Sequence, residues 1–364
     1  MSDPTLSRDA PAHRVFWIAG TRGEILALGP AFLQLSRRGD RRSPQHRFAL
    51  TGEHGMEAMQ TLDHLELRAH QSEPICHPAD EPAARLNNIM QRVEALVRRH
   101  KGDRMIVAGW TATAAAAAVV AHARNTPALW VQPPDPAGLI ARLEWEAGLE
   151  RIIRACAPLV TTYPMSAWPD PPAPGQAPPS IERTHEIPGL RTDAPVILIA
   201  VLRRHWGIFS DTTGLLARVA TRWAQKEPER DFVVISNLNA RLERPIRSRP
   251  DRPANLLLAP PLPYPVYRQL LGRTLAVLTD SVLIAGEALR RNIPVAALAD
   301  RPGRAGDQPL SLMPAQLAEG QADPLFTRGG GQATEPPPID PAGEIRAVVE
   351  QWLHGGPLEV GPPG

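Results

Sequence analysis

The chain has 364 residues, which is more than one hydrophobic core needs and favours two domains. Hydrophobic residues make up 43% and charged residues 21%, a balance that excludes wholesale disorder. Its 40 basic and 38 acidic side chains leave a net charge of +2, and no long basic block occurs, so nucleic-acid binding is disfavoured.

Two cysteines, Cys76 and Cys156, are too few for a disulfide framework and form no CxxC metal site. The N-terminal residues lack an apolar signal region, and no run of eighteen apolar residues occurs. We therefore expect a cytoplasmic protein without membrane insertion.

In the first half, short apolar runs predict strands, and apolar residues at helical spacing predict helices. The expected strands are RVFWIAG (14–20), RFALTGE (47–53), RMIVAG (104–109) and ALWVQ (128–132). The expected helices are 24–39, 83–100, 111–123 and 142–156. Gly29 and Pro30 should kink the first helix or break its first turns.

The second half repeats this alternation. The expected strands are 196–202, 231–236, 255–259, 275–280 and 293–298. The expected helices are 213–226, 266–273, 285–291 and a final amphipathic helix at 344–353. The alternation predicts an α/β fold with parallel sheets.

A proline-rich segment separates the two halves and predicts the domain boundary. We expect two Rossmann-like, doubly wound domains with a ligand site in the cleft between them, at the carboxyl ends of the strands. The predicted organisation begins with an N-terminal domain (14–163) and a linker or hinge (164–190). A C-terminal nucleotide-sugar-binding domain (191–326) and a Gly/Pro-rich tail (327–364) follow.

Two strand–loop–helix junctions, AGTRGE (19–24) and AGWTATAAAA (108–117), have the form that directs backbone N–H groups toward anions. Arg22 could add a bidentate contact to a phosphate. Such turns occur in any α/β fold. The residues alone favour this ordinary structural interpretation over an anion-binding site. Neither junction is a Walker loop or a GxGxxG fingerprint, so neither ATP nor NAD is indicated.

The segment TGEH (51–54) places Glu53 beside His54 after a strand, as in an acid/base or hydroxyl-binding pair. Four further histidines lack metal-ligand spacing, and we expect them on the surface or in loops: His46, His64, His70 and His77. No metal site is predicted.

In the segment 278–295, Ser281 lies near a helix start and Glu287 lies within that helix. Ser281 could bind a phosphate and Glu287 a ribose hydroxyl. Equally, Ser281 could be an N-cap and Glu287 a solvated helix residue. The spacing alone leaves these interpretations about even.

Taken in order, these motifs resemble the non-hydrolysing UDP-N-acetylglucosamine 2-epimerases, two-domain enzymes of the GT-B fold. That family's GTRPE and first helix are similar to GTRGEILALGP (20–30), and its TGQH is similar to TGEH (51–54). The later matches are PLPY (261–264), QLL (269–271), TDSVLIAGEA (279–288) and NIPV (292–295). The resemblance runs from about residue 14 to residue 306. It implies a UDP-sugar ligand bound by Arg22, Ser281, Glu287 and Arg304, without a cofactor.

Epimerisation in that family eliminates UDP to give a glycal and then adds UDP back, with the C2 proton returned from the other side. This needs a base to take the proton and an acid to return it. The family's catalytic Asp, Glu and His positions correspond here to Trp110, Gln132 and Leu202. These side chains cannot transfer protons at neutral pH. The family's first-helix Lys is Ala27, and its double glycine after Ser281 is Val282-Leu283, which would crowd a phosphate. The resemblance therefore implies inefficient epimerisation, with His54 and His205 as candidate catalytic groups.

Three functions remain open. The first is a diverged epimerase-like enzyme of surface-polysaccharide sugar metabolism. The second is a GT-B glycosyltransferase, which needs leaving-group stabilisation but no acid/base pair at C2; Arg203, Arg204 and Arg304 would fit it. The third is a non-catalytic homologue that regulates or assembles with a partner, such as an active paralogue. The resemblance also implies a homodimer.

Overall fold

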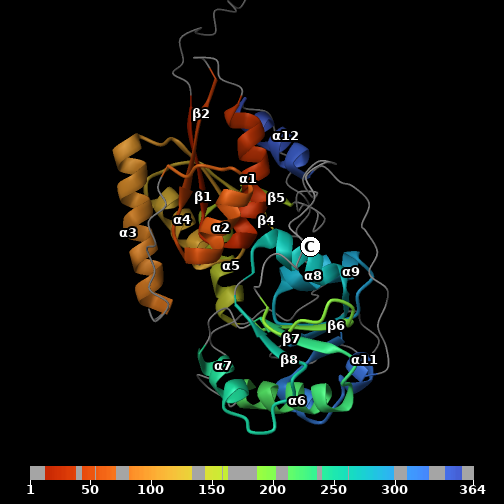
Figure 1. The fold of residues 1–364 in the computed structure, drawn as a ribbon. Coiled ribbons are helices and arrows are strands. Elements are labelled where there is room, and N and C mark those ends of the chain that lie inside the picture. Colours follow the sequence, from red (N-terminus) through yellow and green to blue (C-terminus); the bar gives the residue numbers. More distant parts are fainter. Residues whose placement is uncertain are drawn as a thin grey trace, which may run out of the picture. The chain divides into compact units, whose positions relative to one another are not determined.

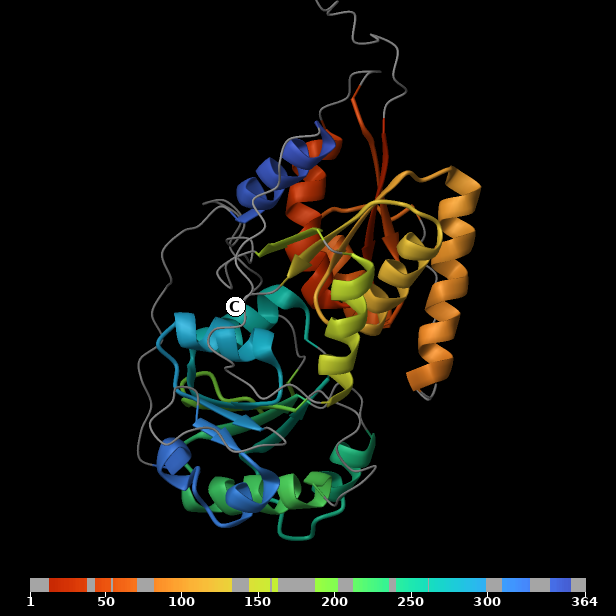
Figure 2. The ribbon, with the colours of Figure 1, turned by 180° about the vertical axis from the view of Figure 1, so that it is seen from behind.

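The computed structural model describes residues 13–37, 43–53, 55–70, 82–132, 144–157, 159–162, 187–201, 212–235, 240–260, 262–298, 310–327 and 341–354. The chain divides into two compact units (Figure 1, Figure 2). We call them unit 1, with the first sheet and the last helix, and unit 2, with the second sheet. Much of the predicted linker, 164–190, lies outside the described residues, so its boundaries stay a prediction.

Unit 1 is built on a parallel sheet with the strand order β2-β1-β3-β4-β5. Its strands are β1 (Arg14–Ala19), β2 (Gln45–Leu50), β3 (Arg104–Ala108), β4 (Ala128–Gln132) and β5 (Leu159–Thr162). Its helices are α1 (Arg22–Ser36), α2 (Gly55–His64), α3 (Pro82–His100), α4 (Ala112–Ala123), α5 (Glu144–Cys156) and α12 (Pro341–Leu353).

Side chains alternate along each strand of unit 1 and therefore fill two cores, one on each face of the sheet. Val15, Trp17 and Ala19 of β1 pack with α1, α2 and α12. Phe16 and Ile18 point the other way and pack with α3, α4 and α5. Both views show α1 and α12 together on one face and α3 on the other (Figure 1, Figure 2). This double coverage explains why the strands read as continuous apolar runs.

The first helix is continuous from Arg22 to Ser36, although Pro30 lies inside it. The expectation that Gly29 and Pro30 would break its first turns is wrong. Ile25, Leu28 and Phe32 are buried in the unit 1 core. Tertiary packing of this kind outweighs the hydrogen bond that a helical proline removes.

Unit 2 is also a parallel doubly wound layer, with the strand order β11-β10-β9-β6-β7-β8. Its strands are β6 (Val196–Ala200), β7 (Asp231–Ile235), β8 (Leu256–Ala259), β9 (Thr274–Thr279), β10 (Val295–Leu298) and β11 (Leu310–Leu312). Its helices are α6 (Thr212–Lys226), α7 (Ala240–Arg247), α8 (Tyr264–Gly272), α9 (Val282–Arg290), α10 (Pro314–Ala318) and α11 (Asp323–Thr327).

One face of the unit 2 sheet packs on α6, α7, α10 and α11, around Trp223 and Phe326. Their rings lie 4.3 Å apart between centroids. The helices α8 and α9 lie on the other face (Figure 1). The sequence patterns predicted α6, α8 and α9 but not α10, α11 or β11, which are short, nor α7, which contains Pro245.

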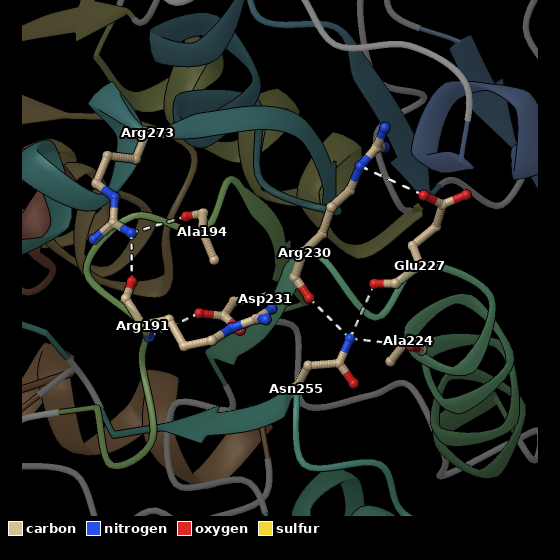
Figure 3. A network of polar contacts seen from close by, with 8 residues as sticks. All are labelled: Arg191, Ala194, Ala224, Glu227, Arg230, Asp231, Asn255 and Arg273. Carbon is tan, nitrogen blue, oxygen red and sulfur yellow. Dashed lines mark hydrogen bonds and ion pairs between the residues drawn. The ribbon is translucent and has the colours of Figure 1, made fainter.

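Polar side chains brace the amino-terminal edge of the unit 2 sheet (Figure 3). Asp231 is fully buried and accepts hydrogen bonds from the backbone N–H and Nε of Arg191, at 2.8 and 2.9 Å. Asn255 donates from Nδ2 to the carbonyls of Ala224, Glu227 and Arg230. This network lies at the amino ends of the strands, opposite the carboxyl edge at which ligands of doubly wound folds bind.

No helix in the described part of the chain is both long and apolar enough to span a membrane.

Candidate functional site

In each unit the carboxyl ends of all the described strands lie at one edge of the sheet, because every strand pair is parallel. The strand order reverses between β1 and β3 in unit 1 and between β6 and β9 in unit 2. Ligands of doubly wound folds bind outside the carboxyl ends of the strands at such switch points. The loops that follow these four strands are therefore the candidate site elements.

The loop after β1 is held by the carboxyl group of Glu24. Its Oε2 accepts hydrogen bonds from the backbone N–H of Gly20 at 2.5 Å and of Thr21 at 2.8 Å. Thr21 in turn caps α1 by accepting the N–H of Glu24 at 3.3 Å, which completes a capping box. The hydroxyl of Thr111, in the loop after β3, donates to Oε1 of Glu24. Glu24 thus ties the two loops of the unit 1 switch point together.

A second carboxylate ties the loop after β2 to the same place. Oε2 of Glu53 accepts from the backbone N–H and the hydroxyl of Thr113, at 3.1 and 2.9 Å. The hydroxyls of Thr113 and Thr51 lie 2.6 Å apart. The backbone N–H groups of Gly20, Thr21 and Thr113 are therefore bonded to the carboxyl groups of Glu24 and Glu53. An incoming anion would need other donors, such as the side chain of Arg22.

Gly20 lets these three loops converge. A Cβ atom at this position would lie 2.1 Å from Oγ1 of Thr113 and 2.4 Å from Oγ1 of Thr51. No real Cβ approaches heavy atoms so closely, and both hydroxyls are already fixed by hydrogen bonds. The glycine is required by close packing at the switch point.

The carboxyl of Glu24 is only 3% exposed. Burial, together with repulsion from the nearby Glu53 carboxylate, raises the pKa of Glu24 to about 8, against the lowering effect of its hydrogen bonds. Glu24 is therefore mostly protonated at neutral pH. A carboxyl group with this property in the first turn of α1, at the switch point, is a candidate functional group.

In unit 2, Ser281 is the N-cap of α9 and accepts the N–H of Ile284 at 3.4 Å. Its own N–H donates to Oγ1 of Thr279, which donates to the carbonyl of Ala200 at the end of β6. The cap interpretation of Ser281 is thus confirmed. Its half-exposed side chain still lies at the switch point, where a phosphate contact was predicted.

Glu287 is half-buried in α9, which disfavours the alternative of a solvated helix residue that the spacing had left open. Its Oε1 accepts a hydrogen bond from the hydroxyl of Tyr264 at 2.8 Å. Tyr264 begins α8, is 4% exposed and stacks against Tyr267 with ring centroids 6.2 Å apart. The sequence contained Tyr264 within PLPY, but nothing in its pattern indicated the contact with Glu287.

Trp110 and Gln132, which the sequence comparison set against the family's catalytic Asp and Glu, carry a bulky and a neutral side chain. Trp110 packs, half-buried, against the α3–α5 core of unit 1. Gln132 ends β4 and is half-buried. Arg22 is the first residue of α1 and is half-buried as well. The predicted site residues His54, His205 and Arg304 lie outside the described residues, as does Leu202.

Two of the four remaining histidines, His46 and His64, lie in regular secondary structure and correct the expectation that they lie on the surface or in loops. His64 is the last residue of α2 and is half-buried. His46 lies in β2, is half-buried and accepts a hydrogen bond from the indole N–H of Trp17 at 3.0 Å. Burial lowers the pKa of His46 to about 4. His77 is outside the described residues, and within the described ones no three His, Cys, Asp or Glu side chains gather as metal ligands would.

No family model and no curated protein matches the chain. Solved structures do. The UDP-GlcNAc 2-epimerase from Neisseria meningitidis, bound to UDP-GlcNAc, is 19% identical with a TM-score of 0.72, over 94% of this chain and 100% of that one. The S. aureus MnaA protein, in a co-structure with UDP, is 15% identical with a TM-score of 0.71, over 96% and 100%.

The UDP-GlcNAc 2-epimerase from Methanocaldococcus jannaschii, in complex with UDP-GlcNAc and UDP, is 13% identical with a TM-score of 0.64, over 93% and 99%. At such identities a match establishes the fold and not the activity. The chain thus has the fold of these epimerases, and the predicted class of two Rossmann-like, doubly wound domains of the GT-B type is confirmed.

Proposed function

We propose that the protein binds a UDP-sugar and is an epimerase-like protein whose epimerisation is slow. The observation that carries this proposal is the shared fold, which spans the whole length of an epimerase solved with UDP-GlcNAc bound. Polar groups at both switch points support it, because nucleotide phosphates and riboses are bound at this edge of such sheets.

In this proposal, the guanidinium of Arg22 and the hydroxyl of Ser281 contact the diphosphate, and Arg304 adds a second cation. Glu287 accepts from a ribose hydroxyl while Tyr264 orients its carboxylate through the 2.8 Å hydrogen bond. The ligand lies at the carboxyl edges of the sheets, beside the loops at the two switch points. The protein acts as a cytoplasmic homodimer in surface-polysaccharide sugar metabolism.

Slow epimerisation follows from the substituted positions. Removal of the C2 proton and its return each need a group that titrates, and a general acid or base contributes about 10²–10⁴ in rate. Trp110, Gln132 and Leu202 cannot supply one. His54 and His205 are the proposed substitutes.

The test is proton NMR of UDP-N-acetylglucosamine incubated in D₂O with a large amount of the protein. We expect line broadening from binding and only slow loss of the C2 proton, with manno-configured product. His54→Ala and His205→Ala should each remove that residual exchange. Absence of both broadening and exchange would overturn the proposal.

Two other outcomes correspond to other functions. Binding without any exchange, even after long incubation, indicates a glycosyltransferase, which the loss of the acid/base positions also favours. No binding indicates a non-catalytic partner protein, and the search would then turn to an active paralogue. Light scattering after size exclusion tests the homodimer.

A further inference from the structure

Two carboxyl groups lie within the unit 1 switch point, and both are engaged by the loops that would face a ligand. Glu24 accepts from Gly20, Thr21 and Thr111, while Glu53 accepts from Thr113. These bonds join the loops after β1, β2 and β3. A change in the charge of either carboxyl therefore changes the forces on all three loops at once.

The surroundings of Glu24 favour its neutral form. The carboxyl is 3% exposed, and Glu53 from the β2 loop is the charged side chain in the described part of the chain that acts on it. Arg22 lies two residues earlier on the same helix, and β3 and α4 present the hydroxyls of Thr111 and Thr113. A hydroxyl both donates and accepts, so Thr111 can stay bonded to either protonation state of Glu24.

We propose that Glu24 and Glu53 position the ligand-facing loops of unit 1 and couple UDP-sugar binding to the uptake of one proton. This inference rests on the proposed function. A diphosphate at the carboxyl edge adds negative charge near Glu24, which further disfavours the ionised carboxylate. A proton then moves from solvent to a carboxylate oxygen of Glu24, and no other bond is made or broken.

The sign of the coupling follows from linkage. At about pH 6 Glu24 already holds its proton, so ligand binding takes up none there. At about pH 8.5 much of Glu24 is ionised, so binding takes up a proton and affinity falls as pH rises. The affinity of the wild type should be several-fold higher at the lower pH.

Glu24→Gln reproduces the neutral form. The amide oxygen can accept from Gly20 and Thr21, and the amide nitrogen can donate to Thr111. This variant should bind the ligand at every pH as the wild type does under acidic conditions. Glu53→Gln removes the repulsive charge but leaves Glu24 buried. The pH range over which this variant loses affinity for the ligand should therefore move to lower pH.

The experiment is titration calorimetry with UDP-N-acetylglucosamine, whose diphosphate diester does not titrate between about pH 6 and 8.5, in buffers of different ionisation enthalpy. Carbon-13 NMR of side-chain carboxyls follows Glu24 without ligand, with Glu24→Gln assigning the signal. We expect proton uptake at the higher pH in the wild type and none in Glu24→Gln. If Glu24 had a purely structural role, the Glu24→Gln variant would bind the ligand more weakly but with the same dependence on pH as the wild type.

Three results would overturn the coupling. Binding by the wild type that does not vary with pH overturns it alone, as does a Glu24→Gln variant that binds poorly under acidic conditions. A complete lack of binding at any pH overturns the proposed function together with the coupling.

Discussion

The indole N–H of Trp17 donates to Nδ1 of His46, 3.0 Å away, across the neighbouring strands β1 and β2. The imidazole must be neutral at this nitrogen to accept that bond. Because the group is partly buried, its folded pKa is about 4, below the ordinary 6.5. The contact thus ties part of the stability of unit 1 to pH.

The first prediction concerns acid stability. The unfolded state takes up a proton at His46 below about pH 6.5, and the folded state does so only near pH 4, so this group's contribution falls as pH drops through that window. His46→Gln can still accept the indole N–H but does not titrate. Thermal unfolding should therefore depend less on pH in this variant. An unchanged pH slope would contradict the assignment.

Gly20→Ala should destabilise the protein by about 1–3 kcal/mol, because the added methyl would overlap the hydroxyls of Thr51 and Thr113. Gly148→Ala is the matched control. It lies in α5 with nothing within 4 Å of the added Cβ, and should be stabilising by roughly 0.5–1 kcal/mol. Urea unfolding measures both. Equal effects of the two changes would disprove the close approach at Gly20.

Asn255→Asp should destabilise unit 2 more than Asn255→Ala does. The amide Nδ2 lies 2.8–3.1 Å from three carbonyl oxygens (Figure 3), and a carboxylate in its place would repel them. Loss of the donor costs about 1–3 kcal/mol, and the charge adds to that. Hydrogen exchange of the β7 and β8 amides reports the effect. Tolerance of the aspartate would show that the network contributes little.

Tyr264→Phe should weaken UDP-sugar binding by roughly 0.5–1.5 kcal/mol, since Glu287 loses the hydroxyl that orients it. Tyr267→Phe removes the hydroxyl of the stacked neighbouring ring and leaves the Tyr264 contact with Glu287 in place. Calorimetry with UDP-N-acetylglucosamine compares the two. If both variants bind as the wild type does, Glu287 does not hold the ribose.

Much of the fold could be predicted from apolar periodicity, since strands buried on both faces read as apolar runs and the amphipathic helices α3, α5 and α6 carry a clear repeat. Short elements such as β5 and α10 could not be predicted, because so few residues are not enough to show a period. Pro30 misled the prediction because propensity is a local quantity, whereas α1 is stabilised by the core it covers.

The sequence by itself determined the parallel α/β class, the Gly-terminated loops after the strands and the order of motifs that resemble the epimerases. Only the tertiary structure decided that Glu24 and Glu53 occupy the backbone donors of those loops and that Tyr264 holds Glu287. These partners lie 3 to 60 residues apart in the chain. Hydrogen bonding and burial depend on distances in space, which the crossover connections of the sheets set and local sequence patterns do not encode.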